Sequence, residues 1–71
     1  MPTSVNAHIT GTVWKIEVAV GDVIAAGQVC VIIESMKMEL PVEAPRAGRV
    51  EGIRVTEGQA VAEGDTLLTL V

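Results

Sequence analysis

Short runs in which apolar and polar residues alternate, separated by glycine-containing turns, make up most of the chain. A period of two residues is typical of half-buried β-strands, and no window shows a sustained helical period. The pattern predicts eight strands, at Thr3–Ile9, Thr12–Val18, Val23–Ile24, Val29–Met36, Met38–Ala44, Arg49–Val55, Ala60–Val61 and Thr66–Val71.

The second half of the chain repeats the first at an offset of 37 residues. Val5–Glu34 aligns with Val42–Val71 without a gap, and nine of the thirty aligned pairs are identical. Six of the seven glycines pair with one another, as Gly11/Gly48, Gly21/Gly58 and Gly27/Gly64. Because glycine marks positions where the backbone needs a positive φ or a close approach, the two halves are expected to share one fold.

Neither half can bury its apolar side alone, because a lone hairpin or three short strands are only marginally stable in water. The repeat therefore predicts that the halves face each other and close an aliphatic core between two sheets. We expect an all-β fold formed by residues 1–71 as a single domain. Its form would be a flattened β-barrel or sandwich (a barrel-sandwich hybrid) of two four-stranded antiparallel sheets with a pseudo-two-fold internal repeat.

Composition and charge narrow the classes of function. A net charge of −4, with only five scattered basic residues, argues against nucleic acid as a partner. No apolar run approaches the ~20 residues of a membrane span, and the N-terminus lacks the features of a secretion signal. Cys30 and His8 are the only residues of their kinds, which argues against an internal disulfide and a zinc site. These features predict a cytoplasmic protein without a membrane partner.

The segment Val31–Val42 is strongly apolar, yet it contains Lys37. A hairpin with a two-residue turn at Met36-Lys37 pairs apolar with apolar positions on one face and two glutamates on the other. The pairs are Val31/Val42, Ile33/Leu40, Ser35/Met38 and Glu34/Glu39. A four-residue turn gives the same register, so both turn lengths stay open. In either case Lys37 lies at the tip, and the two-fold repeat places it at the pole opposite both termini.

Two features of the predicted tip each cost a little folding free energy. A two-residue type I′ turn needs a positive φ at both central positions and favours Asn-Gly, so Met36-Lys37 would be strained there. Glu34 opposite Glu39 adds like-charge repulsion. Strain at a site is a hint of function, and here it surrounds one lysine.

The hexapeptide Glu34-Ser35-Met36-Lys37-Met38-Glu39, with "VGDVIAAGQ" before it and "APRAGRV" after it, resembles the biotinyl/lipoyl attachment domain family. The Met-Lys-Met centre is similar to the biotin carboxyl carrier branch, and the resemblance to short stand-alone attachment proteins covers essentially the full chain. Ser35 stands where that branch most often has alanine. The gap-free repeat leaves no room for the inserted loop of bacterial acetyl-CoA carboxylase carriers.

The resemblance implies a function as a biotin carboxyl carrier that has no catalytic activity of its own. A biotin protein ligase would attach biotin covalently to Lys37. The biotin would then shuttle carboxylate between a biotin carboxylase and a carboxyltransferase. Tethering delivers the intermediate to two sites without release.

The residues beside Lys37 are candidates for recognition by the ligase and the other partners. Met36 at the tip offers an exposed thioether for an adaptable protein contact. Met38 has the core-facing parity of its strand, which favours packing over recognition. Glu34 and Glu39 are expected to form a solvated acidic face, with a recognition role as the alternative.

Three alternative functions stay open at this point. Lys37 could carry lipoate, although lipoyl domains more often have Asp-Lys-Ala at the tip. The unmodified barrel could serve as a structural or adaptor module, although such modules usually carry a long helical insert at this hairpin. An enzyme with Lys37 as a Schiff-base residue is disfavoured, because an exposed tip lysine lacks the desolvation that depresses a lysine pKa.

Overall fold

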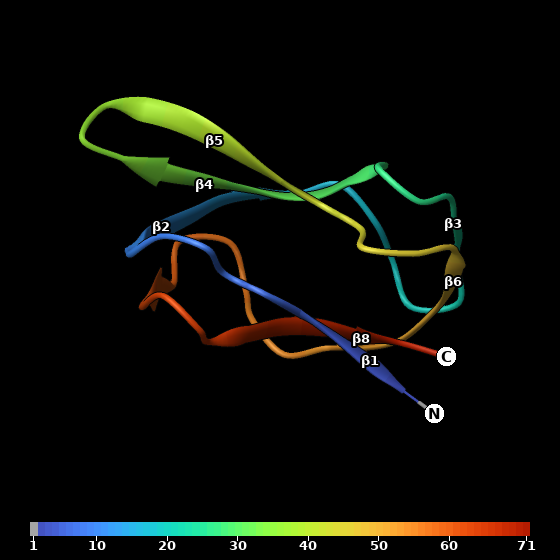
Figure 1. The fold of residues 1–71 in the computed structure, drawn as a ribbon. Helices are drawn as coiled ribbons and strands as arrows, with labels where there is room; N and C mark the ends of the chain where they lie inside the picture. The colour runs from blue at the N-terminus through green and yellow to red at the C-terminus, as the bar shows by residue number, and fades with distance from the viewer. Residues whose placement is uncertain (1) are drawn as a thin grey trace.

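Eight strands make up the computed structural model, which describes residues 2–71 (Figure 1). They are β1 (Thr3–Asn6), β2 (Gly11–Ile16), β3 (Val23–Ile24), β4 (Val29–Ser35), β5 (Met38–Glu43), β6 (Gly48–Ile53), β7 (Ala60–Val61) and β8 (Thr66–Leu70). Each corresponds to a predicted strand, although β1, β2 and β6 end two or three residues early. The predictions overran because buried Ala7 and Val18 continue the apolar alternation where strand pairing has already stopped.

The strands form two four-stranded sheets with antiparallel pairing throughout, in the orders β1-β8-β6-β3 and β5-β4-β2-β7. The predicted fold class is therefore confirmed. Each sheet takes two strands from each half of the chain, so the halves interlock across the sandwich. A shift of 37 residues converts β1, β2, β3 and β4 into β5, β6, β7 and β8 and exchanges the two sheets.

The hydrogen bonds of the loops repeat with the same two-fold relation. The backbone N–H of Gly21 donates to Val50 (2.9 Å), and that of its counterpart Gly58 donates to Val13 (2.7 Å). Ala19 N–H donates to the Asp22 carboxylate (2.9 Å), and this bond is matched by one from Thr56 N–H to Gln59 Oε1 (3.1 Å). The repeat in sequence is therefore a repeat of backbone path.

Four glycines turn the chain through the left-handed region, with φ of 95° at Gly21, 83° at Gly27, 90° at Gly58 and 93° at Gly64. Apart from the glycine itself and its two chain neighbours, no residue has an atom within 4 Å of a Cβ built on any of them, so an alanine there would be strained by backbone conformation alone. We expect each Gly→Ala variant to lose about 1 kcal/mol of unfolding free energy, with matching losses within each repeat pair. Denaturant titration measures this, and a clear loss at Gly27 with none at Gly64 would contradict it.

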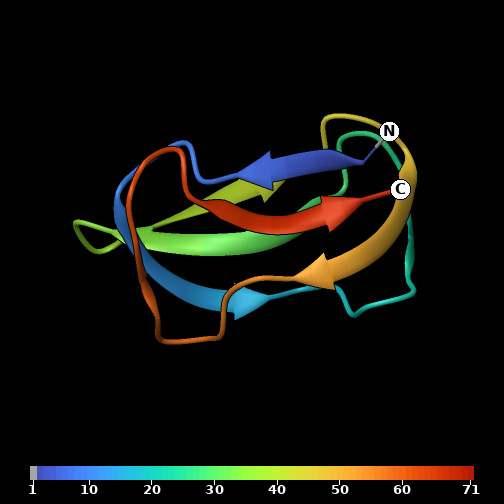
Figure 2. The same cartoon turned by 90° about the horizontal axis from the view of Figure 1, so that it is seen from below.

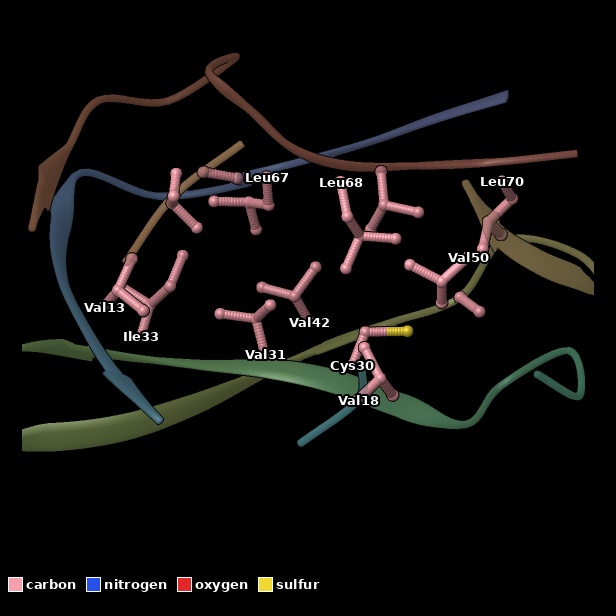
Figure 3. Packing of buried hydrophobic residues seen from close by; sticks show 14 of the residues in the cluster. Val13, Val18, Cys30, Val31, Ile33, Val42, Val50, Leu67, Leu68 and Leu70 are labelled. Atoms are coloured by element: carbon pink, nitrogen blue, oxygen red, sulfur yellow. The ribbon is translucent and has the colours of Figure 1, made fainter. Parts of the chain in front are cut away.

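The core lies between the sheets and is wholly aliphatic apart from Cys30 (Figure 3). In each half a β-bulge places two consecutive residues in it, Cys30-Val31 on β4 and Leu67-Leu68 on β8. Burial raises the pKa of the free Cys30 thiol above its ordinary value. A buried thiol of raised pKa is a packing residue and a poor nucleophile.

The β4–β5 hairpin projects from one end of the sandwich, and both termini lie at the other end (Figures 1 and 2). The molecule is elongated, with extents of 32 × 18 × 17 Å. The hairpin therefore lies at the pole opposite the termini, as the repeat predicted. Residues 2–71 contain no helix long and apolar enough to cross a membrane.

Candidate functional site

The β4–β5 hairpin has the predicted register. Its cross-strand pairs are Val31/Val42, Ile32/Pro41, Ile33/Leu40, Glu34/Glu39 and Ser35/Met38. Because Ser35 pairs directly with Met38, the turn consists of Met36 and Lys37 alone, and the four-residue alternative is excluded. Lys37 is therefore one of two residues at the extreme tip of the hairpin.

Both turn residues adopt a positive φ, 53° at Met36 and 64° at Lys37, and they are the only non-glycine residues to do so within residues 2–71. A left-handed conformation brings Cβ close to the following carbonyl oxygen and costs roughly 1–2 kcal/mol for a residue with a side chain. The strain predicted from the sequence is thus present at the lysine, as a consequence of the two-residue turn.

An asparagine in the turn should relieve part of this strain. Met36→Asn is expected to raise the unfolding free energy by about 1 kcal/mol, because asparagine tolerates the left-handed region that methionine avoids. The matched control is Met38→Asn, which lies in extended backbone and should bring no gain. Denaturant titration of both variants checks this. Equal effects at the two positions would show that the turn stores no strain.

The side chains at the tip are turned to solvent. Met36 is 92% exposed and Met38 is 60% exposed, while Lys37 is also exposed. Within the described part of the chain, the Lys37 amine has no hydrogen-bond or ion-pair partner. An amine in this position can enter the active site of another protein without breaking any contact of its own.

The prediction that Met38 packs in the core is wrong. Met38 has the parity of the buried Val42, but the neighbouring strand β2 is paired with β4 only as far as Glu34. The hairpin extends beyond that row, so no strand flanks the last pair, Ser35 and Met38. Because Met38 is exposed, it is available for contact with a partner protein.

Glu34 and Glu39 lie directly opposite each other and are both exposed, as predicted. In residues 2–71 neither carboxylate forms a salt bridge. The two glutamates therefore form an open acidic pair between the lysine and the body of the sandwich.

Two residues at the base of the hairpin were not singled out for the site from the sequence. A Cβ on Gly11 would collide with the Glu34 carbonyl oxygen and would lie 2.8 Å from Cγ2 of Ile33, so glycine lets β2 lie close beside β4. His8 Nε2 donates a hydrogen bond to the carbonyl oxygen of Pro41 (3.1 Å) at the outer edge of β5. The Gly11/Gly48 pair in the repeat marked the first contact, whereas no sequence signal marked the second.

The surroundings of Lys37 are open in the part of the chain that the structure describes. The residues described here enclose no pocket and contain no cluster of His, Cys, Asp and Glu able to hold a metal ion. His8 is engaged at Pro41, and Cys30 lies in the core.

Comparison with known proteins gives matches over nearly the whole chain. The sequence model of the biotin/lipoyl family, described as "Biotin-requiring enzyme", matches residues 1–70. The Biotin/lipoyl attachment protein of Bacillus subtilis is 46% identical over 67 residues, which are 94% of this chain and 92% of that protein. The "Biotinylated protein TB7.3 homolog" of Mycobacterium leprae is 40% identical over 70 residues, 99% of each chain.

A solved structure shares the same fold within a much larger protein. The urea carboxylase of Kluyveromyces lactis matches with a TM-score of 0.94 and 37% sequence identity. The match covers 100% of the present chain but only 6% of the carboxylase chain. The fold described above therefore occurs both in short proteins of this length and as a small part of a large carboxylase.

Proposed function

The chain belongs to the biotin/lipoyl family of biotin-requiring enzymes, and from this membership we propose that it is a biotin carboxyl carrier modified on Lys37. Residues 1–71 act in this proposal as a single biotinyl domain. The observation that carries it is the lysine amine at a protruding two-residue turn, exposed and without a partner in residues 2–71.

The residues present suit covalent attachment of biotin. Acylation requires a primary amine that can enter the active site of a ligase, and the strained turn holds Lys37 clear of both sheets. The Nζ atom, after loss of a proton to the ligase, attacks the acyl carbon of biotinyl-adenylate. A C–N bond forms, the bond from that carbon to the phosphate oxygen breaks, and AMP leaves. The amide that results removes the positive charge of the side chain.

Attached biotin supplies a ureido nitrogen that can carry a carboxyl group. The chain contributes the tether, because the tip at the pole opposite both termini can reach the active sites of separate enzymes in turn. The partners in this cycle are a biotin carboxylase and a carboxyltransferase. This assignment is supported by the fold's occurrence in a carboxylase, where it is a small part of a long chain.

The side chains beside Lys37 provide the recognition surface in this proposal. Met36 and Met38 offer two exposed thioethers, flexible apolar groups that adapt to different protein surfaces. Glu34 and Glu39 offer an acidic pair at the base of the tip, which complements basic residues around the entrance of an active site.

Incubation of the purified chain with biotin protein ligase, ATP and biotin tests the proposal directly. Intact mass spectrometry should show the addition of one biotin per chain, and peptide mapping should place it on Lys37. An unmodified chain after prolonged incubation, or an adduct on Lys15, would refute the assignment.

Lipoate is the second candidate, because the 46% identical relative from B. subtilis is named as an attachment protein for biotin or lipoyl groups. It would use the same exposed amine of Lys37. A parallel incubation with lipoate–protein ligase separates the two. Lipoyl transfer at a rate well above biotin transfer would make the chain a lipoyl carrier.

A further inference from the structure

The outer face of the sheet that bears Lys37 carries an apolar row in its middle. Val31, Ile33 and Val42 point into the core (Figure 3), so Ile32 and Pro41, which alternate with them along β4 and β5, lie on the outer face. Ile32 pairs with Pro41 on one side and with Lys15 on the other, where Trp14 is the extra residue of a β-bulge. We call Pro41, Ile32 and Trp14 the outer row.

The outer row is open to solvent over much of its surface. Trp14 is 46% exposed, Pro41 is exposed and Ile32 is half-buried. An indole side chain on the outside of a small sheet contributes nothing to a core that is closed on the other side. Exposed apolar groups gathered on neighbouring strands mark interaction sites more often than isolated ones do.

The internal repeat supplies a matched comparison for this row. On the other sheet the equivalent positions are Ser4, Thr69 and Glu51, with Ser4 paired to Thr69 and Glu51 in the corresponding bulge. The two sheets have the same strand order, the same bulges and the same kind of core, so the fold places the same demands on both faces. On the outer face of the other sheet, these positions carry polar side chains. The apolar character of the outer row is therefore not a requirement of the backbone that the two sheets share.

Acidic side chains border the outer row. On β5, Glu39 lies on the tip side of Pro41 and Glu43 on the other side, and Glu34 precedes the tip on β4. The nearby Lys15 is already paired with Glu17 at 3.7 Å. A partner that covers the row must therefore present an apolar pocket edged by lysine or arginine.

The distance between the outer row and Lys37 indicates which partner covers the row. Ile32 precedes Lys37 by five residues, a span of about 17 Å along the strand, so one ordinary interface can cover both the tip and the row. Before modification, the reacting atom is Nζ of Lys37 itself, so the acylating enzyme must approach within the length of a lysine side chain. Enzymes that act on the finished arm work farther out and come less close to the sheet.

We propose that the outer row of Pro41, Ile32 and Trp14 is a docking surface for the enzyme that acylates Lys37. This enzyme binds the row through an apolar pocket with a basic rim. This inference rests on the proposed modification of Lys37. Trp14 is the anchor, since large aromatic side chains dominate the binding energy of such interfaces.

Acylation kinetics with purified biotin protein ligase, ATP and biotin test the proposal. Trp14→Glu and Ile32→Thr copy the residues at the equivalent positions of the other sheet, so the backbone should tolerate them. We expect Trp14→Glu to raise the KM for the carrier about tenfold and Ile32→Thr about threefold, with kcat changed less than about twofold. Trp14→Phe should retain most of the affinity. Glu51→Gln and Thr69→Val, on the other sheet, are the matched controls and should leave KM unchanged.

The outcomes separate this inference from the proposed function. Acylation of unaltered chain on Lys37, together with an unchanged KM for Trp14→Glu and Ile32→Thr, overturns the docking surface and leaves the carrier function standing. No acylation of the unaltered chain overturns both. Sedimentation of the unaltered chain as a dimer that Trp14→Glu converts to a monomer would instead assign the row to contact between two copies. If Trp14→Glu fails to fold, the KM of Ile32→Thr decides.

Discussion

Lys37→Arg is expected to abolish biotin incorporation completely while leaving the fold intact. Arginine keeps the positive charge and nearly the length of lysine, but its guanidinium stays protonated and cannot act as the attacking amine. The side chain of Lys37 is exposed and makes no hydrogen bond or ion pair within residues 2–71, so its loss should change the unfolding free energy by less than about 0.5 kcal/mol. Intact mass after treatment with ligase measures incorporation, and circular dichroism with thermal melting measures the fold.

Lys15→Arg is the matched control, because Lys15 is the only other lysine and is also exposed. It lies within β2 and is paired with Glu17 at 3.7 Å, so its amine is neither at a turn nor free. Incorporation in this variant should equal that of the unaltered chain. Residual biotin on Lys37→Arg, lost only when Lys15 is also replaced, would mean that the tip does not select the site.

Gly11→Ala is expected to cause a large loss of stability, about 3 kcal/mol, because the added methyl group meets main chain. A Cβ at this position would collide with the Glu34 carbonyl oxygen and press on the buried Ile33. Both belong to β4, which is paired on its two sides and cannot move away. For a chain of this size, such a loss lowers the melting temperature by roughly 12–24 °C. Thermal unfolding followed by circular dichroism measures it.

Gly52→Ala is the control for the Gly11 variant. Gly52 also lies in a strand, but the nearest atom to a Cβ there is Thr69 Oγ1 at 3.8 Å, an ordinary contact. Its replacement should change stability by less than about 1 kcal/mol, in either direction. Similar losses for the two variants would show that the close approach of β2 to β4 is not what requires glycine at position 11.

Most of the fold could be predicted from the sequence because its main signals are local or repeated. Alternation of period two marked all eight strands, and the duplicated glycines marked the turns with positive φ at Gly21, Gly27, Gly58 and Gly64. The register of the hairpin followed from the segment itself, since a slip of one residue would turn its apolar side outward. The place of Lys37 at the tip needed no information from the rest of the chain.

Other features depend on contacts between distant segments, and only the tertiary structure decided them. The strand order shows that each sheet is built from both halves, whereas alternation states which side of a strand is buried but not which strand lies beside it. Met38 has the parity of a core residue and is nevertheless exposed, because the neighbouring strand is paired only as far as Glu34. The turn length was likewise undecided until the Ser35/Met38 pair was seen.

The motif at Lys37 and the surface beside it differ in the same way: the sequence shows the first, and only the tertiary structure shows the second. The motif around Lys37 is contiguous, so its chemistry is visible in the sequence alone. Pro41, Ile32 and Trp14 are far apart in the chain and become a row only when β5, β4 and β2 lie side by side. Alternation sets which face a side chain occupies, since that depends on the strand's own pleat. Strand pairing decides which side chains become neighbours. That pairing is stabilised by burial of the core between the two sheets.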